Sequence, residues 1–503
     1  MRPLLVSDDR LGQRLRSTQI LGIILSLGLA LAIVFLPFPL NLVVPFGLAL
    51  VVLAVRFPAL FPIALIASVP VQEFGAVQLA GQDVTATKLA VAATVVGLPA
   101  TVFARRWSWR FTWLTGALVL YLSMQALSLR AAVALGPGLA EMYRWTVALI
   151  ALLATLNLVR HAREVWWLAG IVSLLILAET ATGLIQSVLG IAPASFAVTG
   201  GLFRAYGTFG KPNPYAGYLE LAGLWLFPLA LLRWQRVRAA YRRWQSTRLQ
   251  GSAASGPVRR ALLRELAFAF WLTTGVTASI LGIGLSFSRG AWLGTAAALI
   301  VLVAFAPRAI KLTLLTGAIL AVFGLLLSGG AIAPASFRAR AVQLVEQLKP
   351  FDVRDVQVTP ENFATVERMD HWQAGIAMFL AYPWSGVGVG NFNVRFPDFS
   401  PHPGFRISQG HAHNYYIHAA AETGLPGLLA YLALLVVALG TIRRAIRHSP
   451  TALGRALGLG ALAATVALMT HNVVEDLHAL NLSVHTLAVW GLASIAPSLA
   501  DSA

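Results

Sequence analysis

The chain of 503 residues is 57% hydrophobic and only 12% charged, and its mean hydropathy is +0.73. These values exclude an ordinary soluble enzyme, which would carry about twice that share of charged residues, and they place the chain among integral membrane proteins. The chain has no cysteine, so disulfides, thiolate metal ligands and cysteine nucleophiles are excluded as well.

Apolar stretches of membrane-crossing length recur along the sequence. The first, residues 20–36, follows four arginines and has no small-residue cleavage site behind it, so we expect a retained helix with a cytoplasmic N-terminus. Thirteen more spans are predicted at 41–55, 58–70, 87–104, 111–128, 144–158, 165–190, 214–232, 266–286, 291–306, 312–328, 426–441, 456–471 and 482–498. The short spans 41–55 and 58–70 could instead form one re-entrant hairpin. The expected fold class is therefore all-α, a polytopic membrane protein with about 12–14 transmembrane helices.

The distribution of charge predicts the sidedness. Residues 233–264 hold nine arginines and no acid, whereas the polar stretch 329–412 holds seven basic and seven acidic residues. By the positive-inside rule the first is cytoplasmic and the second is translocated. Alternating the side at each span puts most other basic clusters in the cytoplasm, with Arg130 and Arg144 as exceptions. In a membrane protein this pattern explains the net charge of +18 better than a nucleic-acid partner does.

This topology divides the chain into four parts and puts both termini in the cytoplasm. The parts are N-terminal transmembrane helices (1–190), central transmembrane helices with the basic cytoplasmic loop 233–264 (191–328), a large extracytoplasmic loop (329–425) and C-terminal transmembrane helices (426–503). The extracytoplasmic loop is rich in aromatic residues, so we expect it to fold against the membrane surface, with a helix at 369–381.

The most informative string is His-Asn, nine residues and Gly-x-x-Gly, formed by His413, Asn414, Gly424 and Gly427. The nine residues can form a short helix that a left-handed Gly424 terminates, before Pro426 opens the next membrane helix. His413 then lies at a helix start on the outer face, where a neutral imidazole can accept a proton from an attacking hydroxyl. From the spacing alone, a helix-capping or surface histidine is the alternative.

This string resembles the signature of the O-antigen ligase family, which also contains polymerases and protein O-oligosaccharyltransferases. Three further segments resemble that family's patterns and stand in the same order. They are residues 204–214 (RAYGTFGKPNP), 288–292 (SRGAW), and 368–372 leading to 383–392 (PWSGVGVGNF). Together the resemblance covers residues 204–427.

The resemblance implies a membrane glycosyltransferase of the C-type fold, with a glycan on undecaprenyl pyrophosphate as donor and a glycan, lipid or protein as acceptor. The two phosphates of such a donor require cations, and arginine suits that bidentate binding, so Arg204, Arg289 and Arg368 are candidates. His413 is the expected catalytic residue. A base and fixed cations suffice for this reaction, so neither a metal nor another cofactor is expected. The expected supporting residues are Asn213, Asn414, Glu422, Gly424 and Gly427.

Other sites are less favoured by the sequence. His402, His411, His413 and His418 lack helical metal-ligand spacing and have no interleaved acid. The glycines of 386–390 lack the strand that frames a phosphate loop.

A small-anion transporter is the alternative from another functional class. Glu179 and Glu220 fall inside apolar spans, where ionisable groups are usually functional. Essential charges at these two acids would indicate transport, whereas essential charges on the outward arginines and at His413 would indicate transfer.

Overall fold

The structure is a computed structural model that describes residues 52, 56–72, 77–79, 82–198, 201–250, 255–305, 308, 311–312, 316–317, 351–359, 362–408 and 410–499. The predicted span 20–36 lies outside these residues, as do most of 41–55 and 312–328 and the first part of the loop 329–425.

The chain is largely helical over the described ranges. Nine helices there are long and apolar enough to cross a membrane, counting the 3-10 turns that extend α5 and α17. They are α4 (Ala86–Ala104), α5 (Trp113–Ser128), α6 (Leu135–Leu158), α7 (Ala162–Leu189), α8 (Pro212–Leu249), α9 (Ser255–Ser286), α15 (Tyr415–His448), α16 (Ala452–His471) and α17 (Leu482–Ile495). The apolar helix α10 (Arg289–Phe305) is shorter. The predicted all-α polytopic membrane fold is confirmed.

The predicted span 58–70 is wrong as a membrane crossing. Its helix α3 (Leu60–Ser68) has 9 residues, about 14 Å of helix, whereas the hydrocarbon core is about 30 Å thick. Most of α3 is buried, and it packs against α4, α6, α7 and α17. A small antiparallel hairpin follows, with strands β1 (Val77–Leu79) and β2 (Gln82–Val84).

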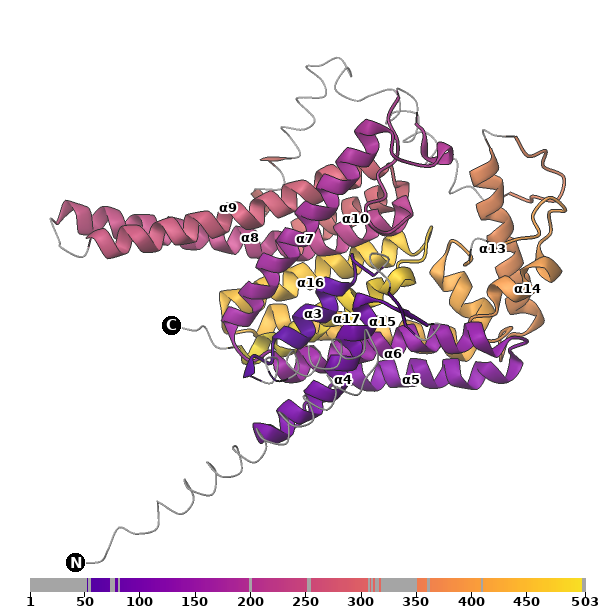
Figure 1. The fold of residues 1–503 in the computed structure, drawn as a ribbon, viewed down its shortest axis with the longest axis horizontal. Coiled ribbons are helices and arrows are strands. Elements are labelled where there is room, and N and C mark those ends of the chain that lie inside the picture. Colours follow the sequence, from indigo (N-terminus) through magenta and orange to yellow (C-terminus); the bar gives the residue numbers. More distant parts are fainter. Residues whose placement is uncertain are drawn as a thin grey trace, which may run out of the picture.

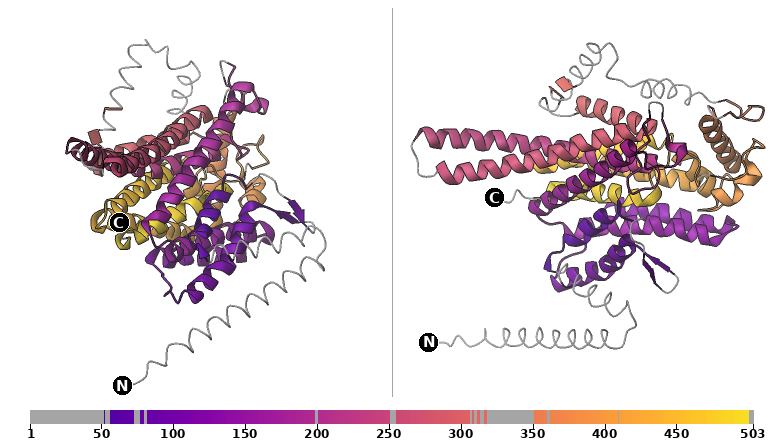
Figure 2. Two further views of the ribbon diagram at one scale, coloured as in Figure 1. Left: turned by 60° about the vertical axis from the view of Figure 1, so that its left-hand side comes forward. Right: turned by 45° about the horizontal axis from the view of Figure 1, so that its top comes forward.

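The helices α13 (Phe363–Ala381) and α14 (Phe392–Phe399) lie beyond one end of the bundle, which we call the α13 end. In Figure 1 and in the right-hand view of Figure 2, α13 runs across the direction of α5 and α6. The helix predicted at 369–381 is thus confirmed as the main part of α13.

The predicted cytoplasmic loop 233–264 is wrong as a loop, because most of it continues α8 and α9 as helix. Arginine, leucine, alanine and glutamine are good helix formers, and α8 and α9 pack along each other. At the base of the pair, Arg233 binds Glu265 at 2.8 Å and its guanidinium lies 3.8 Å from the ring centre of Trp166. Figure 1 shows this hairpin reaching past the other helices on the side away from α13.

The glycines of 386–390 hold the chain after α13 against α15. Gly386, Gly388 and Gly390 all have positive φ, and a Cβ on Gly386 would lie 2.3 Å from the carbonyl oxygen of Glu422. A Cβ on Gly388 would lie 2.5 Å from the Cα of Ala132, at the turn between α5 and α6. These glycines therefore allow three segments of backbone to meet closely.

Helix α15 breaks where this loop meets it. Gly424 has φ 65° and ψ −168°, a region open to glycine but outside the left-handed helical conformation that the sequence predicts. Past the break, the Leu425 amide donates to the carbonyl of Pro383 at 2.7 Å. The break is thus confirmed, and it turns the first two turns of α15 away from its long apolar part.

Candidate active site

A pocket of about 850 Å³ lies at the α13 end. Its walls come from the segment before α8, the first half of α13, the residues around His413 and the turn between α16 and α17. Its charged and imidazole side chains are Arg144, Arg204, Lys211, Arg368, Glu367, Glu475, Asp476, His411, His413 and His418. Four cations against three acids make this a suitable site for an anionic ligand of small-molecule size.

His413 stands directly before α15 but does not cap it. The cap is Asn414, whose Oδ1 accepts the amides of Tyr416 at 3.0 Å and Ile417 at 3.1 Å. His413 has φ 52°, a left-handed conformation that is uncommon outside glycine. Its carbonyl accepts the indole N–H of Trp372 at 3.1 Å, which helps to hold this conformation. The alternative that His413 is a helix cap is therefore wrong.

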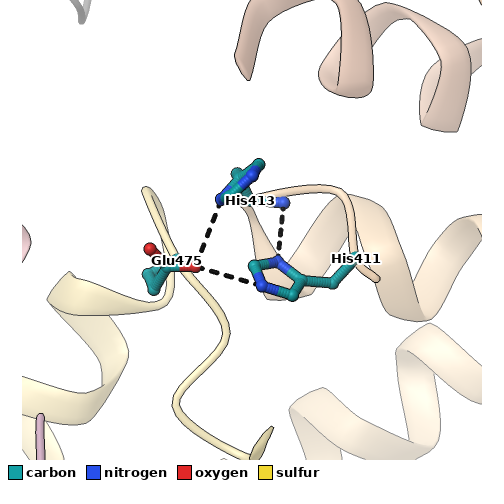
Figure 3. Close-up of side chains that lie close together, drawn as sticks. All are labelled: His411, His413 and Glu475. Carbon is teal, nitrogen blue, oxygen red and sulfur yellow. Dashed lines mark hydrogen bonds and ion pairs between the residues drawn. The ribbon is translucent and has the colours of Figure 1, made fainter. Parts of the chain in front are cut away.

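One carboxylate oxygen joins His413 to His411 (Figure 3). Oε1 of Glu475 lies 3.2 Å from Nδ1 of His413 and 3.3 Å from Nε2 of His411. Nδ1 of His411 also accepts the backbone N–H of His413 at 3.1 Å. Because that nitrogen accepts, His411 carries its proton on Nε2 and donates it to Glu475. With Nδ1 of His413 donating to the same oxygen, Nε2 of His413 is left as the proton acceptor.

Burial and neighbouring charge fix the protonation of this group. Burial, together with the nearby His413, lowers the pKa of His411 to about 3. Burial alone would raise the pKa of Glu475, but His413, His411 and Arg368 hold it well below its usual range. His371, with its ring centre 5.3 Å from that of His413, has a pKa lowered by burial to about 4. His413 thus lies between neutral imidazoles and one ionised carboxylate.

The same three residues could be considered as metal ligands, since one donor atom of each lies within 4.8 Å of the others. Their hydrogen bonds do not fit that role. A neutral imidazole has one lone-pair nitrogen, and His411 already uses its own to accept the N–H of His413. The sequence argument had found no acid beside these histidines; Glu475, 62 residues from His413, supplies one. The arrangement fits a hydrogen-bonded base better than a metal site.

Arg204 reaches this group through Asn213. Its Nε donates to the carbonyl of Ser286 at 2.9 Å, and its Nη2 donates to Oδ1 of Asn213, also at 2.9 Å. The Asn213 amide donates in turn to Oε2 of Glu475. Arg204, Asn213, Glu475 and His413 therefore form one network, and all four line the pocket, as does Arg368.

The other predicted residues lie around the pocket. Arg289 begins α10 and is absent from the pocket lining among the described residues. Glu422 accepts the amides of Gly390 at 2.8 Å and Phe392 at 3.0 Å, and so anchors the glycine loop. Gly427 makes room for the break in α15, since a Cβ there would lie 1.9 Å from Oγ1 of Thr423. With Asn414 and Gly424, Glu422 and Gly427 thus fix the backbone around the site.

Sequence reasoning missed Glu475, Arg144 and Lys211 as pocket residues. A signal was present for two of them. Arg144 was an exception to the positive-inside pattern, and Lys211 stands within the segment 204–214. Glu475 lies between the predicted spans 456–471 and 482–498, and only the fold brings it to His413.

The acids that suggested a transporter are both paired. Glu179 accepts the hydroxyl of Thr208 at 2.7 Å and the Thr208 amide at 3.1 Å, which fixes the segment that carries Arg204. Glu220 lies 2.7 Å from Nδ1 of His471, at the end of α16. Each acid holds a segment that leads into the pocket, which accounts for its burial without a transport role.

Comparison with known proteins agrees with this geometry. Residues 274–432 match the family described as O-antigen ligase, and this segment contains Arg289, Arg368 and His413. The curated proteins contain no match to the chain. The family match spans 159 of the 503 residues and supports the resemblance to that family seen in the sequence.

Proposed function

We propose that the protein transfers a glycan from undecaprenyl pyrophosphate to an acceptor hydroxyl, with His413 as the general base. The observation that carries this proposal is the contact of His413 with Glu475 in a pocket that also contains Arg144, Arg204 and Arg368. A base and a group of cations in one pocket supply the two things that displacement of a sugar pyrophosphate needs.

The proton and the bond changes follow from this placement. The acceptor hydroxyl gives its proton to Nε2 of His413, and its oxygen attacks the anomeric carbon on the face opposite the pyrophosphate. The bond from that carbon to the pyrophosphate oxygen breaks as the new bond forms, so a single displacement inverts the anomeric centre. The ionised Glu475 stabilises the imidazolium that results.

The arginines act on the leaving group. Negative charge builds on the pyrophosphate as the bond breaks, and guanidinium groups bind phosphate oxygens in bidentate fashion. Arg204 is held in place by Ser286 and Asn213, so it needs little reorganisation to do so. Arg289 remains a further candidate because it adjoins Gly290, which packs against His471 and Val474 at the start of the turn that carries Glu475.

We place the α13 end on the extracytoplasmic side of the cell membrane and both termini in the cytoplasm. Basic residues gather at the opposite end. Arg110 and Arg160 lie there, where the Arg110 amide donates to Asn157 and the Arg160 guanidinium lies over the Trp107 ring. The arginine-rich hairpin of α8 and α9 extends to the same side. The positive-inside rule makes that end cytoplasmic. A carrier lipid in the outer leaflet would then present its pyrophosphate at the level of the pocket.

The test is reconstitution of the protein in liposomes with a short glycan on undecaprenyl pyrophosphate. Separate reactions would offer a lipid-linked sugar, a second glycan or a peptide hydroxyl, which distinguishes ligase, polymerase and protein glycosyltransferase. We expect acceptor-dependent release of undecaprenyl pyrophosphate, an inverted linkage by NMR, and full activity in EDTA. Activity that vanished in EDTA and returned with a divalent ion would show that a metal holds the phosphates. Failure of every acceptor would contradict the proposed transfer.

Lysine substitutions test the arginines in the same assay. Lys keeps the charge but lacks the planar fork, so Arg204→Lys, Arg289→Lys and Arg368→Lys should each lower transfer at least about tenfold. Arg354→Lys is the matched control, because Arg354 is exposed and pairs only loosely with Asp352 at 3.5 Å. Equal activity of these three variants and the control would remove the arginines from the mechanism.

A further inference from the structure

The second half of α13 and the turn after it expose an uncharged, apolar face. No Asp, Glu, Lys or Arg occurs from residue 371 to residue 394. Ile376, Leu380 and Trp384, spaced four residues apart, are 45%, 71% and 73% exposed. The opposite face is different, because Ala374 and Met378 are fully buried in the small hydrophobic core beneath α13. Thus the exposed side chains are large hydrophobic groups that this core does not cover.

This face joins the exposed apolar surface of α15. The Leu425 amide donates to the Pro383 carbonyl, one residue before Trp384. From Leu425 onward α15 is the apolar membrane helix, and its exposed side includes Leu429 and Val436. Trp384 therefore lies where the apolar surface of the bundle ends, and α13 lies across the direction of the spanning helices there (Figure 1).

We infer that Ile376, Leu380 and Trp384 insert into the interfacial layer of the bilayer at the α13 end, with membrane lipid as their partner. A helix that lies along the membrane with apolar residues on one face and a tryptophan at headgroup level is a typical interfacial anchor. The first half of α13 carries Arg368 of the pocket. An anchored α13 thus keeps the pocket at the depth of lipid phosphates. The inference needs only the membrane fold and holds whichever reaction the pocket performs.

The test uses nitroxide labels on single introduced cysteines. The chain has no native cysteine that would have to be removed first. Leu380→Cys and Trp384→Cys place labels on the face, and Ile407→Cys is the control, because Ile407 is 84% exposed but belongs to the loop after α14. Each labelled protein would be reconstituted in lipid nanodiscs. Collision of the label with apolar oxygen and with a water-soluble nickel chelate would then be measured by EPR.

We expect the labels at 380 and 384 to collide mainly with oxygen and the label at 407 to collide mainly with the nickel chelate. Labels at 380 and 384 as accessible to nickel as the label at 407 would overturn the inference. Low access to both reagents at 380 and 384 would place a protein partner on this face and would overturn it too.

Discussion

Two histidines that stand two residues apart share one carboxylate oxygen and have different roles. His411 uses both ring nitrogens, one toward Glu475 and one toward the backbone of His413. His413 uses only Nδ1 in the contacts around Glu475, so its Nε2 can take a proton. Sequence spacing cannot distinguish the two histidines, because their hydrogen bonds go to Glu475, which lies in the turn between α16 and α17. In the proposed reaction His411 is accordingly a positioning residue, which makes it a poor control for a substitution of His413.

Glu475→Gln should lower transfer at least about tenfold, because an amide cannot stabilise the imidazolium as a carboxylate does. The pH–rate profile should change as well, with its acidic limb moving to lower pH once the negative charge is gone. His448→Ala is the control, since His448 is exposed at the other end of α15. A Glu475→Gln enzyme with the wild-type rate and profile would show that the contact with His413 has no part in the reaction.

At the scale of elements, the glycine loop after α13 should tolerate no side chain. In Gly388→Ala a methyl group would clash with the backbone of Ala132, and φ of 97° would be strained. The two effects together should cost at least about 1–3 kcal/mol of stability. We expect a lower melting temperature in detergent and lower transfer. Gly116→Ala is the matched control, because a Cβ there meets no atom within 4 Å; equal melting temperatures for both variants would contradict the packing described.

The spanning helices could be predicted from the sequence because hydropathy is a local property of some twenty residues. The α8–α9 hairpin could not, because the arginine-rich stretch 233–264 has no apolar run to mark it as structured. Its helices continue because they pack along each other, a contact that hydropathy does not report. The prediction of a membrane span at α3 failed for the opposite reason. Its residues are apolar enough for a span, but other parts of the protein bury most of them.

At the scale of the whole molecule, single cysteines test the proposed sidedness. Ser246→Cys lies on the exposed tip region of α8, and Ile407→Cys lies at the α13 end. An impermeant thiol reagent added to intact cells should label position 407 and spare position 246 until the cells are opened. Labelling of 246 with protection of 407 would reverse the topology and would remove the pocket from the extracytoplasmic side.

Stability should fall in acid. Burial lowers the pKa of His371 to about 4, and those of His411 and His478 to about 3, whereas an unfolded histidine titrates near 6.5. Below about pH 6.5 the unfolded chain therefore binds more protons than the folded chain. Each of these histidines then lowers the free energy of unfolding by up to about 1.4 kcal/mol for each pH unit of acidification.

The melting temperature in detergent should thus be lower at pH 5 than at pH 7.5. The difference should shrink in His411→Gln, which removes one of the three groups. A melting temperature that stayed constant or rose on acidification would show that these histidines are not buried in their neutral form.

The candidate site was only partly predictable. Arg204, Arg368, Asn213 and His413 could be picked out because they stand in strings that resemble a family. Glu475 could not, since only the fold brings the turn after α16 against His413. The position of Arg289 outside the pocket lining of the described residues likewise depends on how α10 packs against α16.

The most direct measurement is the transfer rate of His413→Ala, reconstituted with its lipid-linked donor, beside His448→Ala and wild type. General-base catalysis contributes about 10²–10⁴ in rate. We predict that His413→Ala loses at least a hundredfold in transfer while it expresses, melts and binds donor like the wild type, and that His448→Ala keeps full activity. If His413→Ala retained more than about a tenth of the wild-type rate, a loss well below that range, His413 would not be the base.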